Sequence, residues 1–350
     1  MSIKDNINNY LINWMAKDGP ESDIVLSSRV RLARNLENES YPNFANDDTR
    51  RSVSKKVHSA ITRQNHLKLH YINMSDLPEI ERELLVEKHL ISPLHAKGNY
   101  EKGLFLNDKE SVSIMLNEED HIRIQVLAAG MQLNDVWEIA NEIDDTLESQ
   151  LDFAFSEKWG YLSTCPTNVG TGLRASIMIH LPALNLRKNI NKMLRAVSQL
   201  GLAVRGLYGE GSESLANIYQ ISNQVTLGHS ETDIIDNLGS VSKQIIEQEK
   251  QARKILLEEN EVNLKDTVRR SLGTLKYAYR ISSEEAMKLL SNVKLGIDLG
   301  IIEGVDNKIL RELMILIRPA HIQKLNGKEL ESIDRDIKRS ELIQARLEMK

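Results

Sequence analysis

The hydrophobic pattern of this chain changes once, at about residue 230, and that change limits the folds open to it. Before it, runs that alternate like β-strands occur at residues 111–116, 122–129, 174–184 and 202–208, several bounded by Gly, Pro or Asn. After it, the chain is rich in Glu, Lys, Arg, Leu and Ile and has no clear strand pattern. We therefore predict an α/β domain at 1–230 and an all-helical domain at 231–350, since 350 residues suffice for two ordinary domains.

Two amphipathic helices are predicted between the strands of the first domain. Apolar residues recur with helical spacing at Val136, Ile139, Ala140, Ile143 and Leu147, and again at Ile190, Met193, Leu194, Val197 and Leu200. Gly201 follows the second set, at the position where a glycine commonly ends a helix.

The charge and cysteine content exclude several classes of protein. A net charge of −5 and a pI near 6.0 argue against a general nucleic-acid binder, which is normally basic. The single cysteine, Cys165, rules out an internal disulfide and fits a reducing compartment. The N-terminus has no signal-peptide pattern, and no stretch approaches the roughly 20 apolar residues of a membrane span. We expect a soluble, cytoplasmic protein with no membrane or direct nucleic-acid partner.

Carboxylates follow strand-like runs at two places. Glu118, Glu119 and Asp120 separate the runs 111–116 and 122–129, and Glu210 lies between glycines after the run that begins at 202. An isolated acid on a loop is usually a solvated surface residue. Acids gathered at strand ends would instead suit a cationic substrate.

Five arginines stand at strand edges or beside glycines: Arg29, Arg31, Arg123, Arg174 and Arg205. Arg29 and Arg31 are two residues apart, so on a strand they would share a face. Arginine binds phosphate oxygens with a planar fork and stays charged at physiological pH, so five converging arginines would hold a triphosphate. Any one of them alone would more simply be a solvated surface residue. The glycine-rich "NVGTGLR" lacks the lysine and the Ser or Thr of a P-loop.

Four motifs in this order, "SSRVRLARN", "NEEDHIRI", "TCPTNVGTGLRAS" and "RGLYGE", resemble the phosphagen kinases, the arginine and creatine kinases, over roughly residues 20 to 230. The acidic motif comes much earlier than in those kinases, and the helical tail is additional. That combination is similar to the bacterial protein-arginine kinases, which phosphorylate arginine side chains within proteins. The resemblance implies an α+β catalytic domain with a mainly antiparallel sheet flanked by helices, followed by an all-α C-terminal domain.

The resemblance also implies catalytic roles. A guanidinium is a poor nucleophile because it is protonated and its lone pairs are delocalised, so a carboxylate must orient it and take its proton. Glu119 matches the catalytic base and Glu210 the second carboxylate of the clamp. The register of the acidic motif leaves Glu118 as the alternative base. Cys165 matches the reactive cysteine that helps to place the guanidinium, whereas a lone cysteine is otherwise usually a buried small hydrophobe.

By the same resemblance, the arginines bind the phosphates of ATP. The five arginines match the phosphate clamp, and His89 matches a histidine that contacts the nucleotide, although alone it would read as an ordinary surface or core histidine. Magnesium is expected to arrive with ATP, held mainly by phosphates and water, and no protein ligand to the metal is predicted. The other residues in the matching nucleotide-binding segments are Ser27, Ser28, Val30, Ala175, Ser176, Ile177, Met178, Gly206, Leu207, Tyr208 and Gly209.

The tail segment "RDIKRS", residues 335–340, resembles the phosphoarginine-binding motif of the protein-arginine kinases, with Ser340 where alanine is expected. Arg335 and Arg339 would lie one helical turn apart and grip a phosphate, while Asp336 would pair with the guanidinium of the phosphoarginine. On helical geometry alone, the segment is equally an ordinary solvated charged helix.

The function that the resemblance implies is ATP-dependent phosphorylation of arginine in proteins. It further implies a homodimer, a zinc-binding activator protein, inactivation of a stress-response repressor and delivery of marked proteins to a Clp protease. Two alternatives remain open at this point: a kinase for free arginine or another small guanidino compound, and an inactive adaptor that binds phosphoarginine.

Overall fold

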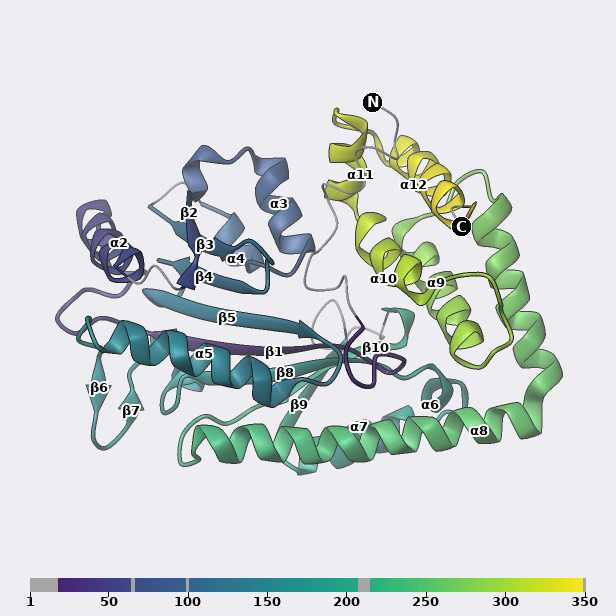
Figure 1. Cartoon of the computed structure of the whole chain (residues 1–350), viewed down its shortest axis with the longest axis horizontal. Coiled ribbons are helices and arrows are strands. Elements are labelled where there is room, and N and C mark those ends of the chain that lie inside the picture. Colours follow the sequence, from purple (N-terminus) through teal and green to yellow (C-terminus); the bar gives the residue numbers. More distant parts are fainter. Residues whose placement is uncertain (1–17, 64–66, 99–100, 207–214, 349–350) are drawn as a thin grey trace.

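A computed structural model describes residues 18–63, 67–98, 101–206 and 215–348 of the chain. Its centre is an eight-stranded sheet of order β2-β3-β4-β5-β1-β8-β10-β9, in which every neighbouring pair is antiparallel (Figure 1). This confirms the predicted antiparallel sheet. The strands are β1 (Val25–Arg34), β2 (Leu69–Asn73), β3 (Gly103–Asn107), β4 (Val112–Leu116), β5 (Ile122–Ala129), β8 (Leu173–His180), β9 (Leu202–Gly206) and β10 (Ile218–Asn223), with a separate pair β6 (Phe155–Ser156) and β7 (Gly160–Tyr161).

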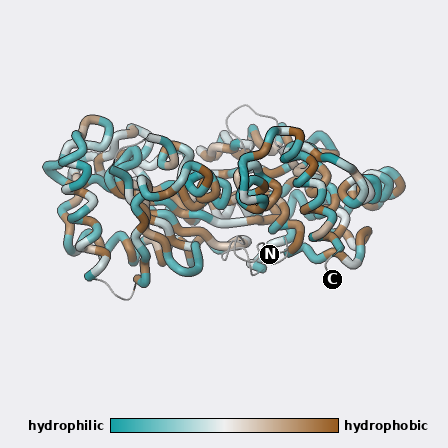
Figure 2. The backbone as a smooth tube through the Cα atoms, turned by 90° about the horizontal axis from the view of Figure 1, so that it is seen from above, coloured by the Kyte–Doolittle hydropathy of each residue, from teal (hydrophilic) through white to brown (hydrophobic). Residues whose placement is uncertain are grey.

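One face of the sheet is apolar and covered by helices. Side chains alternate along a strand, so Val30 and Leu32 of β1 point to the same face as Ile124 of β5 and Ile177 of β8, and all are buried in one core. The helices α2 (Asp47–Thr62), α5 (Leu133–Glu148), α7 (Ile190–Gln199) and the first part of α8 (Glu231–Tyr277) contribute to that core. Hydrophobic residues run through the interior of the molecule and hydrophilic ones along its outer turns (Figure 2).

The opposite face of the sheet carries a smaller apolar cluster and the arginines of β1 and β8, Arg29, Arg31 and Arg174. Met115 of β4 and Leu127 of β5 pack there against Leu90 and Ile91, which follow α3 (Glu79–Glu87), and α4 (Pro93–Ala96) comes next in the chain. Ile315, from the C-terminal part of the chain, belongs to the same cluster. The two parts of the molecule are therefore packed together on this face.

The C-terminal part is helical, as predicted. After α8 come α9 (Ser283–Asp298), α10 (Asn307–Leu316), α11 (Pro319–Asn326) and α12 (Ser332–Glu348). Ser230 and Asp233 form a capping box that begins α8 at Glu231, next to the predicted division. The helix runs along the sheet, then bends where Asn260 leaves the helical conformation (φ −142°, ψ 32°) (Figure 1). The division at 230 and 231 remains a prediction, because the first part of α8 shares the core of the sheet.

A buried ionic network joins α8 and α9. Arg253 Nε lies 3.0 Å from Glu249 and its Nη1 lies 3.5 Å from Asp298, which also pairs with Lys294 at 2.9 Å. Glu249 in turn accepts hydrogen bonds from two backbone amides in α6 (Pro182–Leu186). Because these charged groups are buried, removal of one would leave its partners without compensation, so the network fixes how the helices pack.

Two expectations about local structure are tested directly. Gly201 has φ +75° just after α7, as expected for a glycine that ends a helix. The run 174–184 is not a strand throughout, because β8 ends at His180 and α6 begins at Pro182. Proline has the φ of a first helical residue and lacks the N–H that a strand would use, so the apolar pattern "LPAL" continues as a helix.

Candidate active site

Arg29 and Arg31 of β1 lie on the polar face of the sheet. They alternate with buried Ser28, Val30 and Leu32, as the two-residue spacing predicted. Ser28 faces the other way, where its Oγ donates to the carbonyl of Gly130 at 2.8 Å and accepts from the backbone N–H of Gln132 at 2.9 Å.

The strand register brings the other three arginines to the same face. Arg174 of β8 stands directly opposite Arg31, and Arg123 of β5 stands opposite Ala33, two residues farther along β1. Arg205 of β9 stands opposite Gln220 of β10, whose Oε1 accepts from Arg29 Nη2 at 3.0 Å. Residues paired across antiparallel strands share a face, so the sheet gathers the five arginines on one side.

Burial and the charges of neighbouring arginines lower the pKa values of Arg29 and Arg31. Burial, followed by the charges of Arg123 and Arg174, lowers the pKa of Arg29 to about 10. Burial and the charges of Arg29, Arg123 and Arg174 also lower the pKa of Arg31 well below its usual range, although Glu118 opposes this. Cations held together in this way would be stabilised by a polyanion.

Glu118 is committed to its neighbours. It lies in the turn between β4 and β5, where it is 2% exposed, and its carboxylate pairs with Arg123 Nη1 and accepts from Ser92 Oγ. Burial alone would raise the pKa of Glu118, but the charge of Arg123 and the bonds from Ser92 and Arg123 hold it below the usual value. Glu118 is thus a stable carboxylate already neutralised by the protein.

Glu119 differs from Glu118 in each of these respects. It is only partly buried, and burial together with the charges of Asp120 and Glu118 raises its pKa, opposed by Arg123 and by a hydrogen bond with Cys165. A carboxylate of raised pKa holds a proton more readily, which suits a group that must accept one.

Asp120, for which the sequence predicted no role, joins the β4–β5 turn to the loop between β7 and β8 that carries Cys165, called here the cysteine loop. Its Oδ1 accepts from Asn35 Nδ2 at 2.7 Å and from the backbone N–H of Thr164 at 2.8 Å, and its Oδ2 accepts from Ser163 Oγ at 2.8 Å. The Sγ of Cys165 lies 3.1 Å from Thr167 Oγ1. The side chain of Asp120 therefore holds the loop that places Cys165 beside Glu119.

A cavity of about 70 Å³ marks the point where these groups meet. Its walls include Glu118, Glu119 and Asp120 from the β4–β5 turn, Cys165 from the loop between β7 and β8, and Arg31, Arg123 and Arg174 from the sheet. Carboxylates, a thiol and three guanidinium groups thus line one cavity.

The remaining predicted nucleotide residues divide between the two faces of the sheet. Ser176 lies on the arginine face, where its Oγ accepts from Arg29 Nε at 3.4 Å, and Ser27 and Met178 share that face. The side chains of Val30, Ala175 and Ile177 lie on the apolar face, buried in the core. Gly206 ends β9, and Leu207, Tyr208, Gly209 and Glu210 lie outside the described residues.

His89 is held over the arginine face by its backbone. It has φ +61°, uncommon for a residue other than glycine, and its carbonyl accepts from Gln125 Nε2 at 2.9 Å. Burial, then the charges of Arg318 and Arg29, lower the pKa of His89 well below its usual range, so the ring is neutral at physiological pH. Gln125 lies opposite Arg31, which brings His89 close to the arginines.

The tail residues lie far along the chain, on α12. Arg339 is 2% exposed, and it donates from Nε to the carbonyl of Ile317 at 2.7 Å and from Nη1 to that of Ile281 at 2.9 Å, besides pairing with Asp336. Ser340 is also buried and donates to the carbonyl of Ala278. Arg335 donates to the carbonyl of Leu330 at 2.7 Å and lines a cavity of about 760 Å³ between α3 and α11. Arg335 and Arg339 therefore have different surroundings.

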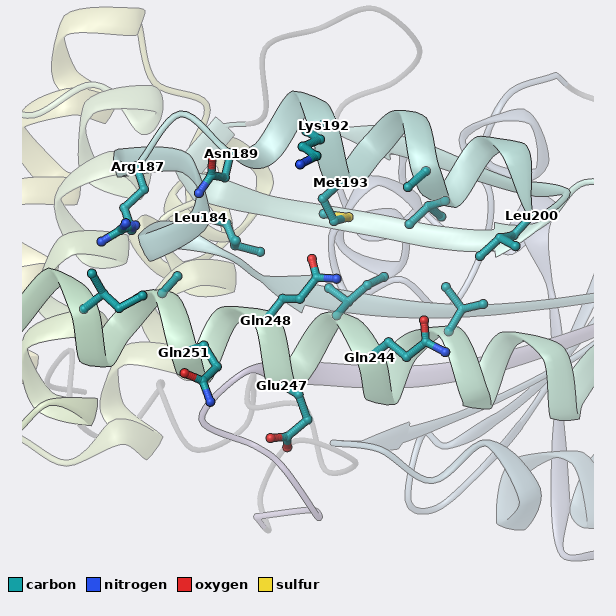
Figure 3. A pocket seen from close by; sticks show the side chains of 16 residues that line it. Leu184, Arg187, Asn189, Lys192, Met193, Leu200, Gln244, Glu247, Gln248 and Gln251 are labelled. Carbon is teal, nitrogen blue, oxygen red and sulfur yellow. The ribbon is translucent and has the colours of Figure 1, made fainter.

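Another groove, of about 540 Å³, lies between α7 and α8 (Figure 3). Gln248 of α8 points toward Met193 of α7, whereas Glu247 points away from it. Apart from Arg187, Lys192 and Glu247, its walls are apolar or carry amides. The groove has one carboxylate, and Glu247 points away from Met193, whereas the cavity on the arginine face joins carboxylates, a thiol and three arginines. We therefore take the arginine face as the candidate active site.

Comparison with known proteins agrees with this geometry. Residues 52–252 match the C-terminal catalytic domain of the ATP:guanido phosphotransferases, and residues 261–350 match the C-terminal domain of the protein-arginine kinase McsB. A protein-arginine kinase of Halothermothrix orenii is 65% identical over 349 residues, which cover all of both chains. The chain belongs to the protein-arginine kinase family.

More distant relatives share the fold of the enzyme. The protein-arginine kinase of Bacillus subtilis is 49% identical over all of this chain and 97% of its own. The crystal structure of a lombricine kinase matches 67% of this chain and 68% of its own, with a TM-score of 0.59 and 25% identity. A duplicated taurocyamine kinase from Schistosoma mansoni, with transition-state analogue components bound, matches 67% of this chain and 34% of its own, with a TM-score of 0.59 and 28% identity.

Several polar residues that the structure brings to the site of this kinase could not be predicted from the sequence. Ser92 holds Glu118, Gln125 holds the carbonyl of His89, and Asn35 and Asp120 hold the turn and the cysteine loop. Their partners are distant in sequence, so no local spacing reveals them. Asp120 carried the only local signal, because it adjoins the two glutamates.

Proposed function

We propose that the enzyme transfers the γ-phosphoryl group of ATP to the guanidinium of arginine side chains in proteins. The main support for this proposal is the cavity that Glu119 and Cys165 line together with Arg31, Arg123 and Arg174. A carboxylate that can take a proton stands beside cations that can hold phosphates, which is what transfer from ATP to a guanidinium requires.

In this mechanism Glu119 is the base. The guanidinium loses a proton to the Glu119 carboxylate as its nitrogen attacks the γ-phosphorus, the bond from that phosphorus to the bridging oxygen breaks, and ADP leaves. Glu118 neutralises Arg123 and is retained by Ser92, so its carboxylate is less suited to accept the proton. Glu210 is proposed as the second carboxylate that orients the guanidinium, on the family resemblance alone.

The arginine face is proposed to hold the phosphates. Arg29, Arg31, Arg123, Arg174 and Arg205 would stabilise the charge that spreads over the transferring oxygens. Magnesium would come as part of the MgATP substrate, bound mainly by phosphate oxygens and water. Among the described residues, no group of three His, Cys, Asp or Glu side chains is placed to hold a metal ion.

Protein arginine is favoured over free arginine by the relatives along the whole chain, which bear the name protein-arginine kinase. Incubation with MgATP, offering casein and free L-arginine in parallel, would separate the alternatives by mass. Phosphate on casein arginine supports the proposal, whereas transfer to free arginine alone supports a small-guanidine kinase. No transfer to either would favour an inactive adaptor. Product on Ser, Thr or Tyr with none on arginine would exclude any guanidine kinase.

The wider biology is also proposed from the family. We propose a cytoplasmic homodimer that works with a zinc-binding activator, inactivates a stress-response repressor and marks proteins for a Clp protease. No described helix has the length and apolar character to cross a membrane. For the tail, we propose regulation by phosphoarginine at Arg335 and Asp336, with Arg339 and Ser340 in the same segment.

A further inference from the structure

The helical C-terminal part of the chain reaches the nucleotide side of the sheet through α11. This helix begins with Arg318 as its N-cap, followed by Pro319, and Arg318 makes no capping hydrogen bond of its own. A helix N-terminus nevertheless needs acceptors for its first N–H groups, which Ser, Thr, Asp or Asn at the N-cap would normally supply. Those acceptors come from another element.

Glu87, the last residue of α3, caps α11. Its Oε1 accepts from the backbone N–H of Ala320 at 2.8 Å, and its Oε2 accepts from that of His321 at 3.0 Å. His321 Nδ1 also lies 2.6 Å from Oε2, and the His321 side chain is completely buried. One carboxylate thus joins α11 to α3 by three contacts, and Figure 1 shows the two helices side by side.

Glu87 stands two residues before His89, so the same junction governs the loop over the arginine face. On the side of the sheet, Gln125 donates hydrogen bonds to the carbonyls of His89 and Leu90, and Ser92 of the loop donates a hydrogen bond to Glu118. On the side of the helical part, Ile315 of α10 packs in one apolar cluster with Leu90 and Ile91 of the loop. The loop therefore lies between the sheet and the helical part.

Arg318 is the charged residue that this junction brings to the nucleotide side. Its Nε donates to the carbonyl of Met314 at 3.4 Å, and its side chain is partly exposed. The backbone N–H of Arg318 donates to the carbonyl of Ile315 at 3.0 Å, and Ile315 packs in one cluster with Leu127, which stands opposite Arg29 on the sheet. The charge of Arg318, like that of Arg29, lowers the pKa of His89. Arg318 of the helical part and Arg29 of the sheet therefore both lie near the loop that carries His89.

We propose that Arg318 contributes a sixth cation to the nucleotide site and that Glu87 is the positioning residue that brings it there. This rests on the proposed function, because it takes the arginine face as the ATP site. The helical part would then complete the nucleotide site, in addition to any role at α12. ATP bound at the arginine face would favour the docked arrangement of α3 and α11, and undocking would weaken ATP binding by the same factor.

The test is ATP affinity, measured by calorimetry on the full chain. Arg318→Met should weaken ATP binding about tenfold or more, as expected for the loss of one charge-assisted contact, and Arg318→Lys should restore part of it. Glu87→Ala should weaken ATP binding in the same direction. In both variants the KM for the protein acceptor should remain near that of the wild type, since the acceptor side is untouched.

Two matched variants make the result decisive. Glu81→Ala removes a partly exposed ion pair between the same two helices, Glu81 with Lys324 at 2.7 Å, and should leave ATP affinity within twofold of wild type. Arg174→Ala reports on the arginine face itself. If Arg174→Ala loses ATP affinity while folded Arg318→Met and Glu87→Ala keep it within twofold, the inference is wrong and the proposed function stands. If the wild type binds no ATP, both are wrong. Should Glu87→Ala not fold, Arg318→Met with its lysine rescue decides alone.

Discussion

Glu118 and Arg123 form an ion pair across the turn between β4 and β5, with the Glu118 side chain 2% exposed. The pair fixes one of the two adjacent glutamates as a permanent anion and one arginine of the cluster as its partner. Glu119, the next residue, borders the cavity with a raised pKa and a bond to Cys165. Two carboxylates of the same type, adjacent in sequence, thereby acquire different chemistry from their surroundings.

Glu119→Gln keeps the shape of the proposed base and removes its ability to take a proton. Arginine phosphorylation should fall by at least about 10²-fold, the usual contribution of a general base, with ATP affinity little changed. Single-turnover rates and calorimetry would measure the two quantities. Glu118→Gln is the matched comparison, and it should mainly reduce stability, because Arg123 would lose its partner. Activity of Glu119→Gln within a few-fold of wild type would end this assignment.

The raised pKa of Glu119 gives a prediction for pH dependence. A base must be deprotonated to act, so the rate should rise with pH through an apparent pKa above that of an ordinary glutamate. The ionisation of Glu119 that raises the reaction rate lowers the folding stability. The folded-state pKa exceeds the unfolded one, so ionisation of Glu119 disfavours folding; this penalty is absent below the unfolded pKa and complete above the folded pKa. Glu119→Gln should therefore be at least as stable as wild type at pH 7 in urea unfolding, and clear destabilisation would contradict the raised pKa.

Arg174→Ala and Arg205→Ala test the phosphate clamp. Each removes a cation from the face shared by β8 and β9, and each should weaken ATP use by roughly 1.5–3 kcal/mol, the value of a charge-assisted hydrogen bond. Arg187→Ala is a suitable control, because Arg187 pairs with Glu259 away from the sheet's polar face. Nucleotide affinity and turnover equal to wild type in both clamp variants would show that ATP binds elsewhere.

The sequence predicted the parts of this site that depend on local geometry. The two-residue spacing of Arg29 and Arg31 placed them on one face, and the runs at 111–116 and 122–129 correspond to β4 and β5. The strands β2, β3 and β10 were not predicted. β2 shows no clean alternation of burial, and β3 is buried on both faces, so neither has the periodic pattern of a half-exposed strand. The order of strands is set by long-range pairing, which only the family resemblance could anticipate.

Asp120→Asn tests the link between the acidic turn and the cysteine loop. The amide oxygen can replace only part of the carboxylate, which accepts from Asn35, Ser163 and the N–H of Thr164. We expect Cys165 to react faster with a thiol reagent and kcat to fall, with ATP affinity near that of wild type. Ser163→Ala, which removes one of these donors, should show a smaller change in the same direction. Unchanged thiol reactivity in both variants would mean that the loop is held by other contacts.

The tail requires its two arginines to be tested separately, because the structure gives them different surroundings. Arg339 is buried and satisfies the carbonyls of Ile317 and Ile281, so Arg339→Ala should reduce the free energy of unfolding by about 1–3 kcal/mol for each acceptor left unpaired. Loss of phosphoarginine binding in that variant would not distinguish a binding role from a folding role.

Arg335 is partly exposed at the cavity between α3 and α11, so Arg335→Ala should preserve the fold. If the segment binds phosphoarginine, calorimetry on Arg335→Ala should show at least about tenfold weaker binding, with Lys338→Ala, which breaks only a surface pair with Glu341, as the control. Equal phosphoarginine affinity in Arg335→Ala and wild type would leave α12 as a structural helix, with Arg339 holding α12 to the chain segments that carry Ile281 and Ile317.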